Sequence, residues 1–232
     1  MSTTYNTPLQ STSLYLRRQF LKLILSPIIR LLMDVQIIGL ENVPEDVHII
    51  CPNHNSLFEP PLVLFFWPRW PESIGAADVW NRPGQGAMAR IFGGIPLKRY
   101  EFDRQALEQA LEVLEAGLPL LIAPEGGRSP TVTLRRGKPG VAYLADHSGV
   151  PVVPVAVEGT YRELLKDALK LKRPRVVIHI GAPIHLPPLE GRGATMRASR
   201  QRNADRIMLE IAKKLPPDYH GAYAGLHIPE DA

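Results

Sequence analysis

Residues 51–60 read Cys-Pro-Asn-His-Asn-Ser-Leu-Phe-Glu-Pro, and the other patterns in the chain gain their meaning from this stretch. It begins where the apolar run Val47–Ile50 stops, and it ends at Pro60, which with Pro61 begins a new apolar segment. A histidine followed five residues later by a carboxylate, at the end of a predicted strand, is how a fold presents an oriented base. We therefore expect His54 and Glu59 to work as a pair.

The two prolines decide whether this pair can meet. Positions five apart on an α-helix point about 140° away from each other. Pro60 and Pro61 disfavour helical geometry just before them, so we expect the regular helix to begin at about Pro60 or Pro61. His54 to Glu59 then forms a compact turn that folds the carboxylate back onto the imidazole. The alternative is a capping box, for which Ser56 and Glu59 have the right spacing and which the same prolines weaken.

Composition bounds the possible functions. The chain has 232 residues, of which 45% are hydrophobic, which suits one sizeable α/β domain with an appendage. A net charge of +4 and a pI near 9.3 favour an anionic partner: a phospholipid surface, a phosphate-bearing substrate or nucleic acid. The single cysteine, Cys51, excludes an internal disulfide framework and suits a reducing compartment. We interpret Cys51 as a buried residue at a strand end and not as a catalytic thiol.

The N-terminal segment predicts a polar tail, Met1–Ser13, followed by an amphipathic helix over Leu14–Met33. Its charge-free centre, Leu23–Ile29, is far shorter than the roughly 20 residues that span a bilayer. Pro27 predicts a kink. The helix either packs on the domain or anchors it at a membrane interface, and both can hold on different faces. The basic residues of the segment are Arg17, Arg18, Lys22 and Arg30. We divide the chain into 1–34 (tail and membrane-associating helix) and 35–232 (α/β domain).

Strand and helix patterns alternate through the rest of the chain. The predicted strands are Val35–Leu40, Val47–Cys51, Leu118–Ala123, Val150–Val157 and Arg175–Ile180. The predicted helices are Pro60–Trp70, one from the cap Asp103 to Gly117, one near Val141–Ser148 and Thr195–Leu215, with loop and short helix over Asn81–Gly94. This alternation predicts an α/β fold with a mixed, partly parallel sheet flanked by helices. The almost wholly apolar segment Pro60–Trp70 favours a buried helix, with the alternative that Trp67, Arg69 and Trp70 at its far end lie at a membrane interface.

Four segments resemble the motifs of one enzyme family. Asn-His-x-Ser-x-x-Glu at 53–59 resembles the His-x4-Asp motif of the glycerolipid acyltransferases related to lysophosphatidate acyltransferase. Gly94–Arg99 resembles the family's second block, and Pro124–Ser129 resembles the third, commonly Glu-Gly-Thr-Arg-Ser. Val150–Val155 resembles the fourth, with a proline inside a buried strand. The four lie in family order over about 35–183, so together they are a strong signal.

Three residues depart from the family pattern. Glu59 replaces the usual Asp, which keeps the carboxylate on a longer arm. Gly127 replaces the usual Thr, and Lys98 stands where an acidic residue is frequent. The last two lie where the family binds its acyl acceptor, so they bear on the head group more than on the reaction.

The resemblance implies an O-acyltransferase that moves a fatty acyl group from a thioester, acyl-CoA or acyl carrier protein, to a lysophospholipid hydroxyl. The expected acceptor is 1-acylglycerol-3-phosphate, and the expected product is phosphatidic acid. His54 would be the general base and Glu59 would orient it. Arg99 and Arg128 would bind the phosphate, and Glu125 a glycerol hydroxyl. The implied substrate-binding residues are Lys98, Arg99, Glu125, Gly126, Gly127, Arg128 and Ser129.

The resemblance also sets expectations for partners. It implies no metal and no bound cofactor, peripheral or monotopic attachment to the cytoplasmic face of a membrane, acyl carrier protein as a candidate partner, and no nucleic acid. The arginines over Arg197–Arg206 suit a solvated helix face without stacking aromatics. The alternatives are another lysolipid acceptor, or a non-catalytic peripheral protein that binds anionic lipid, which leaves the ordered His54, Arg99 and Arg128 unexplained.

Overall fold

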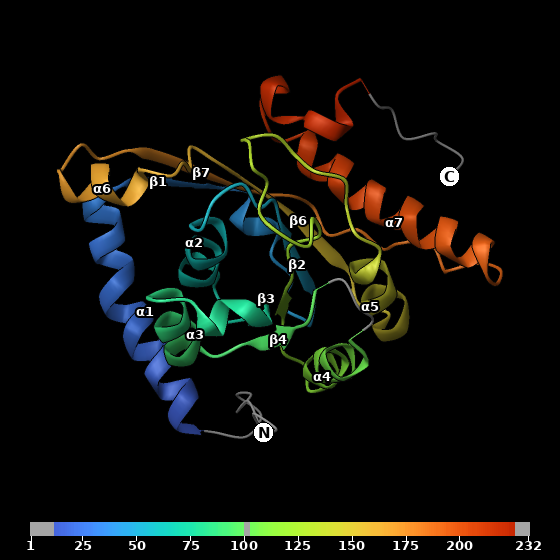
Figure 1. The fold of residues 1–232 in the computed structure, drawn as a ribbon. Helices are drawn as coiled ribbons and strands as arrows, with labels where there is room; N and C mark the ends of the chain where they lie inside the picture. Colours follow the sequence, from blue (N-terminus) through green and yellow to red (C-terminus); the bar gives the residue numbers. More distant parts are fainter. Residues whose placement is uncertain (1–11, 100–102, 226–232) are drawn as a thin grey trace.

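A central sheet organises the protein in the computed structural model, which describes residues 12–99 and 103–225 (Figure 1). Within these ranges seven strands form one sheet in the order β1-β7-β6-β2-β5-β3-β4. The strands are β1 (Asp34–Ile38), β2 (Ile49–Pro52), β3 (Glu72–Ala76), β4 (Ile95–Leu97), β5 (Leu120–Leu121), β6 (Val152–Glu158) and β7 (Arg175–Ile180). Only the β6–β7 pair is antiparallel among these neighbours. The predicted mixed, partly parallel sheet is confirmed.

Helices cover both faces of the sheet. They are α1 (Thr12–Leu32), α2 (Glu59–Phe66), α3 (Gln85–Phe92), α4 (Arg104–Glu115), α5 (Gly140–Ser148), α6 (Leu164–Leu169) and α7 (Ala194–Ala212). Local chemistry sets the ends of α4 as the sequence predicts. The Asp103 side chain accepts a hydrogen bond from the amide of Ala106 at 3.2 Å, and Gly117 after the helix adopts a left-handed φ of 73°.

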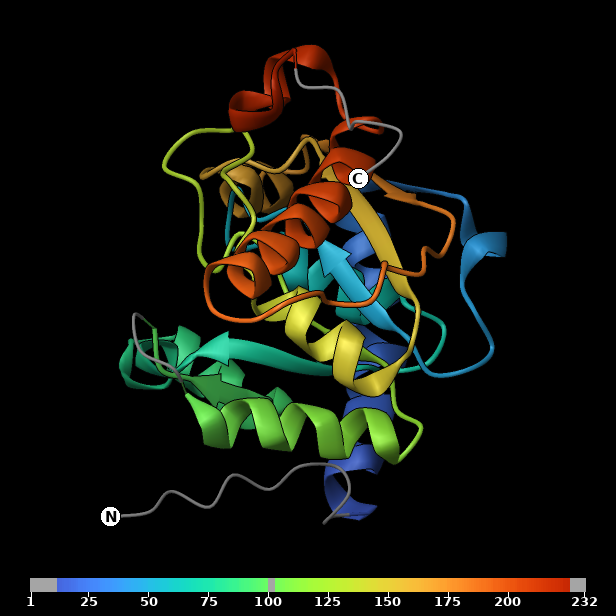
Figure 2. The same cartoon turned by 90° about the vertical axis from the view of Figure 1, so that its right-hand side faces the viewer.

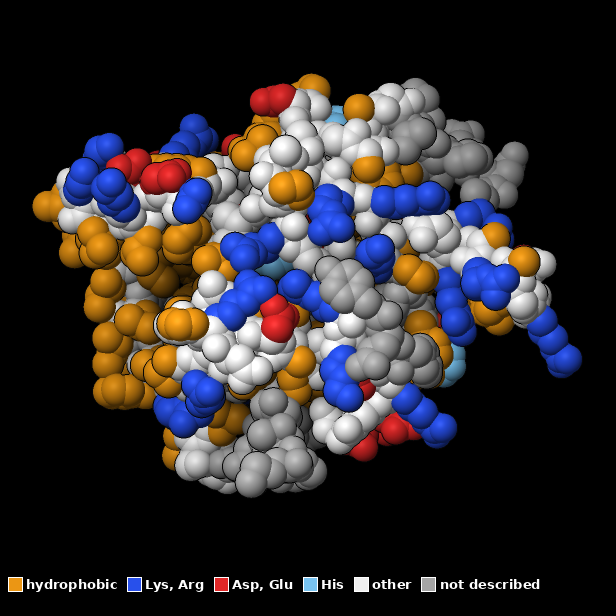
Figure 3. All heavy atoms as spheres, in the orientation of Figure 1, with side chains coloured by type: hydrophobic (Ala, Val, Ile, Leu, Met, Phe, Trp, Pro, Cys, Tyr) orange, Lys and Arg blue, Asp and Glu red, His pale blue; other side chains and the backbone are white. Residues whose placement is uncertain are grey.

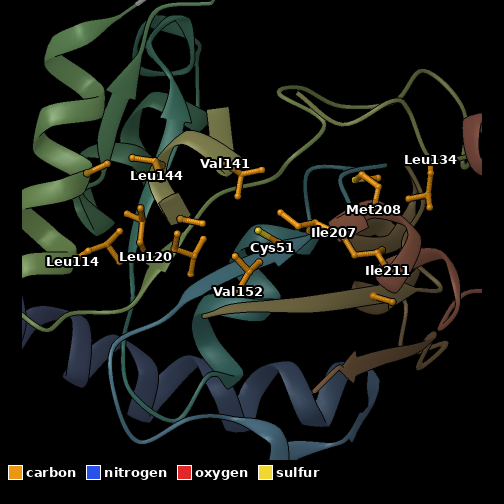
Figure 4. Close-up of a cluster of buried hydrophobic side chains, with 14 of the residues drawn as sticks. Cys51, Leu114, Leu120, Leu134, Val141, Leu144, Val152, Ile207, Met208 and Ile211 are labelled. Carbon is orange, nitrogen blue, oxygen red and sulfur yellow. The ribbon is translucent and has the colours of Figure 1, made fainter. Parts of the chain in front are cut away.

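One apolar cluster lies between the sheet and the helices α4, α5 and α7, which stand in front of the sheet in Figure 2. Figure 4 shows part of this cluster, with Leu120 and Val152 from the strands, Leu144 from α5 and Ile207 from α7. Cys51 of β2 is fully buried in it, as expected, and burial raises the pKa of its thiol far above the ordinary value. Because side chains alternate along a strand, the next residue of β6, Val153, enters the cluster on the other face.

The second cluster lies under α1, α2 and α6, and it contains Trp67. The indole N–H of Trp67 donates to Nε2 of His48 at 3.1 Å, and Trp70 stacks on Phe92 with ring centroids 5.9 Å apart. Trp67 and Trp70 are 1% and 6% exposed. The buried helix favoured for this segment is therefore confirmed, and the alternative that the two tryptophans lie at a membrane interface is wrong, because the domain and α1 bury them.

The cations of α1 each contact the domain, although Arg17 and Arg30 remain exposed to solvent. Arg18 is buried, forms two hydrogen bonds with the Glu72 carboxylate at 2.9 and 3.0 Å, and donates to the carbonyl of Phe92 at 2.6 Å. Lys22 donates to the carbonyls of Trp67 and Pro68, Arg17 to the carbonyl of Arg90, and the Arg30 guanidinium lies 4.8 Å from the Phe66 ring centroid. These side chains dock the helix onto the domain.

The opposite face of α1 is apolar and exposed. Its stripe consists of Leu16, Phe20, Leu23, Pro27 and Leu31, at helical spacing, and Leu23 and Leu31 are 74% and 70% exposed. Hydrophobic side chains gather along this side of the molecule in Figure 3. The helix continues through Pro27. Among the described residues no helix has the length and hydropathy to cross a membrane, and residues 1–11 of the expected tail lie outside them.

Candidate active site

The sequence-predicted site residues meet at one edge of the sheet. β2, β4, β5 and β6 run parallel within it, so their carboxyl ends share an edge. His54 follows β2, Arg99 follows β4, Glu125 follows β5, and Thr160 follows β6. Figure 3 shows Lys and Arg side chains gathered in the middle of one face.

The backbone that carries His54 is fixed from both sides. Asn53 is fully buried and pairs with the backbone of Val157: its Nδ2 donates to the carbonyl at 3.0 Å and its Oδ1 accepts from the amide at 2.7 Å. The His54 carbonyl accepts from the amide of Ser129 at 2.8 Å, and the His54 amide donates to Oε1 of Glu125 at 2.7 Å. The turn is therefore anchored to β6 and to the segment after β5.

His54 and Glu59 are in contact, as the turn predicts. Nδ1 of His54 lies 3.4 Å from Oε2 of Glu59, and the His54 side chain is 16% exposed while that of Glu59 is fully buried. A proton on Nδ1 facing the carboxylate leaves the lone pair on Nε2. In the described part of the chain Nε2 meets no hydrogen-bond partner, so this nitrogen can accept a proton from a bound molecule.

Two further donors hold the Glu59 carboxylate. Both of its oxygens lie 2.9 Å from the amide nitrogen of Ser56, and the Thr160 hydroxyl donates to Oε1. Burial raises the pKa of Glu59, but the hydrogen bonds from His54, Thr160 and Ser56, together with attraction to His54, outweigh it and leave the pKa below its ordinary value. Glu59 is thus a buried carboxylate kept ionised beside the imidazole.

The Glu59 carboxylate makes both contacts that the sequence offered as alternatives: one with His54, and one of the kind found in a capping box. Glu59 reaches back to the amide of Ser56 as a capping box requires, but the Ser56 hydroxyl accepts from the amide of Phe58, at 3.0 Å, and not from that of Glu59. The helix α2 begins at Glu59, slightly before the expected start, because Phe58 is already helical and prolines suit the first turn. The early start does not separate the pair.

The Glu125 carboxylate accepts hydrogen bonds from two backbone amides of the protein. Its Oε1 accepts from the amide of His54 at 2.7 Å and its Oε2 from the amide of Arg135 at 2.9 Å, and the residue is fully buried. Burial raises the pKa of Glu125 to about 7 and outweighs the two amide hydrogen bonds, which lower it. The carboxylate thus joins the backbone of the base to that of Arg135, in the loop between β5 and α5. Its contact with a glycerol hydroxyl stays a prediction.

The remaining predicted residues line the same edge. Arg99 is half-buried beside Gly127, while the side chains of Lys98 and Arg128 are exposed. Gly126 has a left-handed φ of 66°, and a β-carbon there would meet Cγ of Lys138 at 2.9 Å. The buried Ser129 hydroxyl accepts from the amide of Thr131, so it supports the loop.

Some contacts were not predicted from sequence. Thr160 and Arg135 contact Glu59 and Glu125 from positions that no short motif joins to His54, and Asn53 pairs with the backbone of Val157 in β6. Asn53 is part of the quoted motif, and its polarity beside a buried strand is the one signal that could have suggested its role.

Comparison with known proteins gives matches over the part of the chain that contains these site residues. A family model described as Acyltransferase matches residues 34–158, more than half of the chain. A chloroplastic 1-acyl-sn-glycerol-3-phosphate acyltransferase of Arabidopsis thaliana is 30% identical over 158 residues, covering 65% of this chain and 44% of that protein. The enzyme of the same name from Pseudomonas aeruginosa is 28% identical over 77% of this chain and 69% of its own.

A solved structure is also similar. The crystal structure of the 1-acyl-sn-glycerophosphate acyltransferase of Thermotoga maritima aligns with a TM-score of 0.57 and 26% identity, covering 84% of this chain and 78% of that one. The chain spans about half the length of most of the curated relatives it matches. The matched region carries the His54–Glu59 turn, the Glu125 segment and β6, so the chain belongs to the acyltransferase family.

Proposed function

We propose that this protein transfers a fatty acyl group from a thioester, acyl-CoA or acyl carrier protein, to the free hydroxyl of 1-acylglycerol-3-phosphate. The observation that supports this most is the contact of His54 with the buried, ionised Glu59 at an edge bordered by arginines. The names of the relatives supply the acceptor, since each is called a 1-acyl-sn-glycerol-3-phosphate acyltransferase.

The site residues suit each step of that reaction. Nε2 of His54 removes the proton of the acceptor hydroxyl while the oxygen attacks the thioester carbon. Glu59 accepts from Nδ1 and stabilises the imidazolium that forms. When the tetrahedral intermediate collapses, the C–S bond breaks and His54 returns the proton to the leaving thiolate. The base thus ends each turnover neutral, and an ester has replaced the thioester.

The basic residues suit the charge of the acceptor. Guanidinium groups bind phosphate through paired hydrogen bonds, a geometry that lysine does not offer. We assign the phosphate to the arginine side of the site, with Lys98, Gly126, Gly127, Arg128 and Ser129 around it. Glu125 acts by placing the His54 backbone.

We further propose that α1 attaches the protein to the cytoplasmic face of a membrane without crossing it. Its cations dock onto the domain, so the attachment rests on the apolar stripe and not on the basic residues expected to assist it. A lysophospholipid and a long-chain acyl group both partition into bilayers, which makes such a position useful for an acyltransferase.

Incubation of the purified protein with acyl-CoA and a panel of lysophospholipids tests the activity, with thiol release and lipid product measured together. We expect release that depends on the acceptor, and phosphatidic acid from 1-acylglycerol-3-phosphate. If thiol is released only with a different lysolipid, that lysolipid is the acceptor in place of 1-acylglycerol-3-phosphate. If the protein binds lipid but releases no thiol from acyl-CoA or from acyl carrier protein, the non-catalytic lipid-binding alternative is favoured.

A further inference from the structure

The loop 130–138 between β5 and α5 is held in place by the C-terminal segment. The amide of Leu134 donates to the carbonyl of Tyr219 at 2.7 Å, and the Leu134 carbonyl accepts from the amide of Ala222 at 3.0 Å. The amide of Gly137 donates to the Tyr223 hydroxyl at 2.8 Å. The residues on either side of Arg135 and Arg136 are therefore anchored, which holds the backbone of these two arginines in place.

The two adjacent arginines have different surroundings. Arg136 is 69% exposed at its side chain and pairs with Asp205 of α7 at 3.2 Å. Arg135 is exposed as well, but it contacts residues of the active site: its amide donates to Glu125 at 2.9 Å, and its Nη1 donates to the carbonyl of Arg128 at 3.2 Å. Glu125 also accepts from the amide of His54, so one buried carboxylate positions both Arg135 and the base.

Gly127 marks the place where two guanidinium groups converge. A β-carbon built on Gly127 would lie 3.6 Å from Nη1 of Arg135, and 3.8 Å from Cζ and 3.9 Å from Nη1 of Arg99. The backbone of Gly127 is outside the left-handed region, so its conformation does not require glycine. The missing side chain instead leaves room between the two cations.

No carboxylate of the described residues is in direct contact with these guanidinium groups, although Glu125 is near enough to attract Arg135. Neither Arg99 nor Arg135 forms an ion pair with a described Asp or Glu. Two guanidinium groups beside one glycine repel each other, and an anion bound between them removes that repulsion. A phosphomonoester, with close to two negative charges and three terminal oxygens, matches such a pair better than a phosphodiester.

We propose that Arg135, together with Arg99, binds the phosphomonoester of the acceptor and determines specificity for it, with Gly127 keeping the space between them open. This inference rests on the proposed function for the identity of the acceptor. It assigns the second cation of the phosphate site to Arg135, whose guanidinium lies beside Gly127, in place of Arg128, which contributes its carbonyl to hold Arg135.

The test compares Arg135→Gln with Arg136→Gln, the neighbouring arginine that points to α7. With 1-acylglycerol-3-phosphate, Arg135→Gln should raise KM for the acceptor by roughly tenfold to a hundredfold, as expected for a lost charge-assisted hydrogen bond. The KM for acyl-CoA and the turnover of monoacylglycerol, which lacks the phosphate, should change by less than about twofold. Arg136→Gln should leave all three values within that range, and Arg135→Lys should recover only part of the loss.

Two glycine variants probe the space between the guanidiniums. Gly127→Ala places its β-carbon at ordinary contact distance and should change the KM for the acceptor little. Gly127→Val adds branches that reach the guanidinium groups, so it should raise that KM as Arg135→Gln does. Equal behaviour of the Ala and Val variants would show that the opening at Gly127 has no part in specificity.

A binding measurement separates this inference from the proposed function. Calorimetry with glycerol 3-phosphate should detect binding to the wild type and to Arg136→Gln, and a loss of roughly tenfold or more in Arg135→Gln. If the wild type binds glycerol 3-phosphate but transfers no acyl group, the proposed function fails and the anion site stands. If the wild type does not bind it, or if Arg135→Gln binds and reacts as the wild type does, the assignment of Arg135 is overturned.

Discussion

At the scale of single residues, Glu59 has two duties that sequence reasoning treated as rivals. It closes the turn by accepting from the amide of Ser56, and it contacts Nδ1 of His54. Sequence predicted the contact because the two prolines limit where α2 can begin. It did not predict Thr160, which lies 101 positions along the chain from Glu59 and reaches it only because β6 neighbours β2 in the sheet.

Substitutions at Glu59 and Thr160 separate these duties. Glu59→Gln keeps the size but removes the charge that supports the imidazolium, so kcat should fall by about a hundredfold or more. Thr160→Val leaves the charge and the Ser56 contact and should lower kcat by about tenfold, with Thr160→Ser restoring it. Glu59→Asp should keep much of the activity. A purely capping role predicts instead that Glu59→Gln leaves both kcat and thermal stability nearly unchanged, since Gln also serves at that position of a capping box. Steady-state kinetics beside thermal melts distinguishes the two.

The raised pKa of Glu125 predicts how stability depends on pH. The folded protein holds the Glu125 proton up to about pH 7, whereas an unfolded glutamate releases it near its ordinary pKa of 4.5. The folded state therefore binds more protons between these values, and its free energy of unfolding falls as pH rises through that window. Glu125→Gln should abolish this fall in the free energy of unfolding, which amounts to on the order of 3 kcal/mol across the window. Chemical denaturation of both proteins from pH 4 to 8 checks it, and parallel curves would contradict it.

At the scale of elements, the sequence pattern predicts most strands and helices well. The β-branched run of β6 and the helical spacing of α4 carry strong local signals. The strand β3 was not predicted because Glu72, Ser73 and Gly75 give it a polar, glycine-containing sequence. Its buried Glu72 is stabilised by Arg18, 54 positions earlier, and no local pattern contains that partner.

The helix α1 shows the same limit of local reasoning. Its periodicity predicts an apolar face and a basic face, but the sequence cannot tell which of them the domain covers. The structure turns the basic side chains toward the domain, because carbonyls, Glu72 and the Phe66 ring offer them partners. The apolar stripe is left outside, so membrane attachment would depend on hydrophobic contact more than on charge.

Vesicle binding tests that expectation. Replacing Leu16, Phe20 and Leu23 together by Ser should weaken binding to phospholipid vesicles by at least about a hundredfold, given the apolar area removed. Molar salt should release little of the wild type, and neutral and anionic vesicles should bind it similarly, because the cations contact the domain. Point variants are preferable to deleting residues 1–33, since Ile29 and Met33 pack into the apolar cluster. Complete release by salt would mean that charge holds the protein to the membrane.

At the scale of the whole molecule, the fold explains why four separated motifs form one site. Parallel strands bring their carboxyl ends to one edge of the sheet. Each motif either follows a strand that ends at this edge or lies within such a strand. The order of motifs predicted the class of fold and the position of the turn. The sequence indicates that residues 130–138 form a basic loop, but it could not predict where this loop lies, because Tyr219, Ala222 and Tyr223 from the far end of the chain hold it in place.

The rate of thiol release by His54→Ala tests the central claim most directly. The assay measures release from acyl-CoA in the presence of 1-acylglycerol-3-phosphate, with His147→Ala as a control at a histidine on the surface of α5. We expect folded His54→Ala to lose about a hundredfold to ten-thousandfold in turnover, while His147→Ala stays close to the wild type. Substantial acyl transfer by a folded His54→Ala protein would contradict the account.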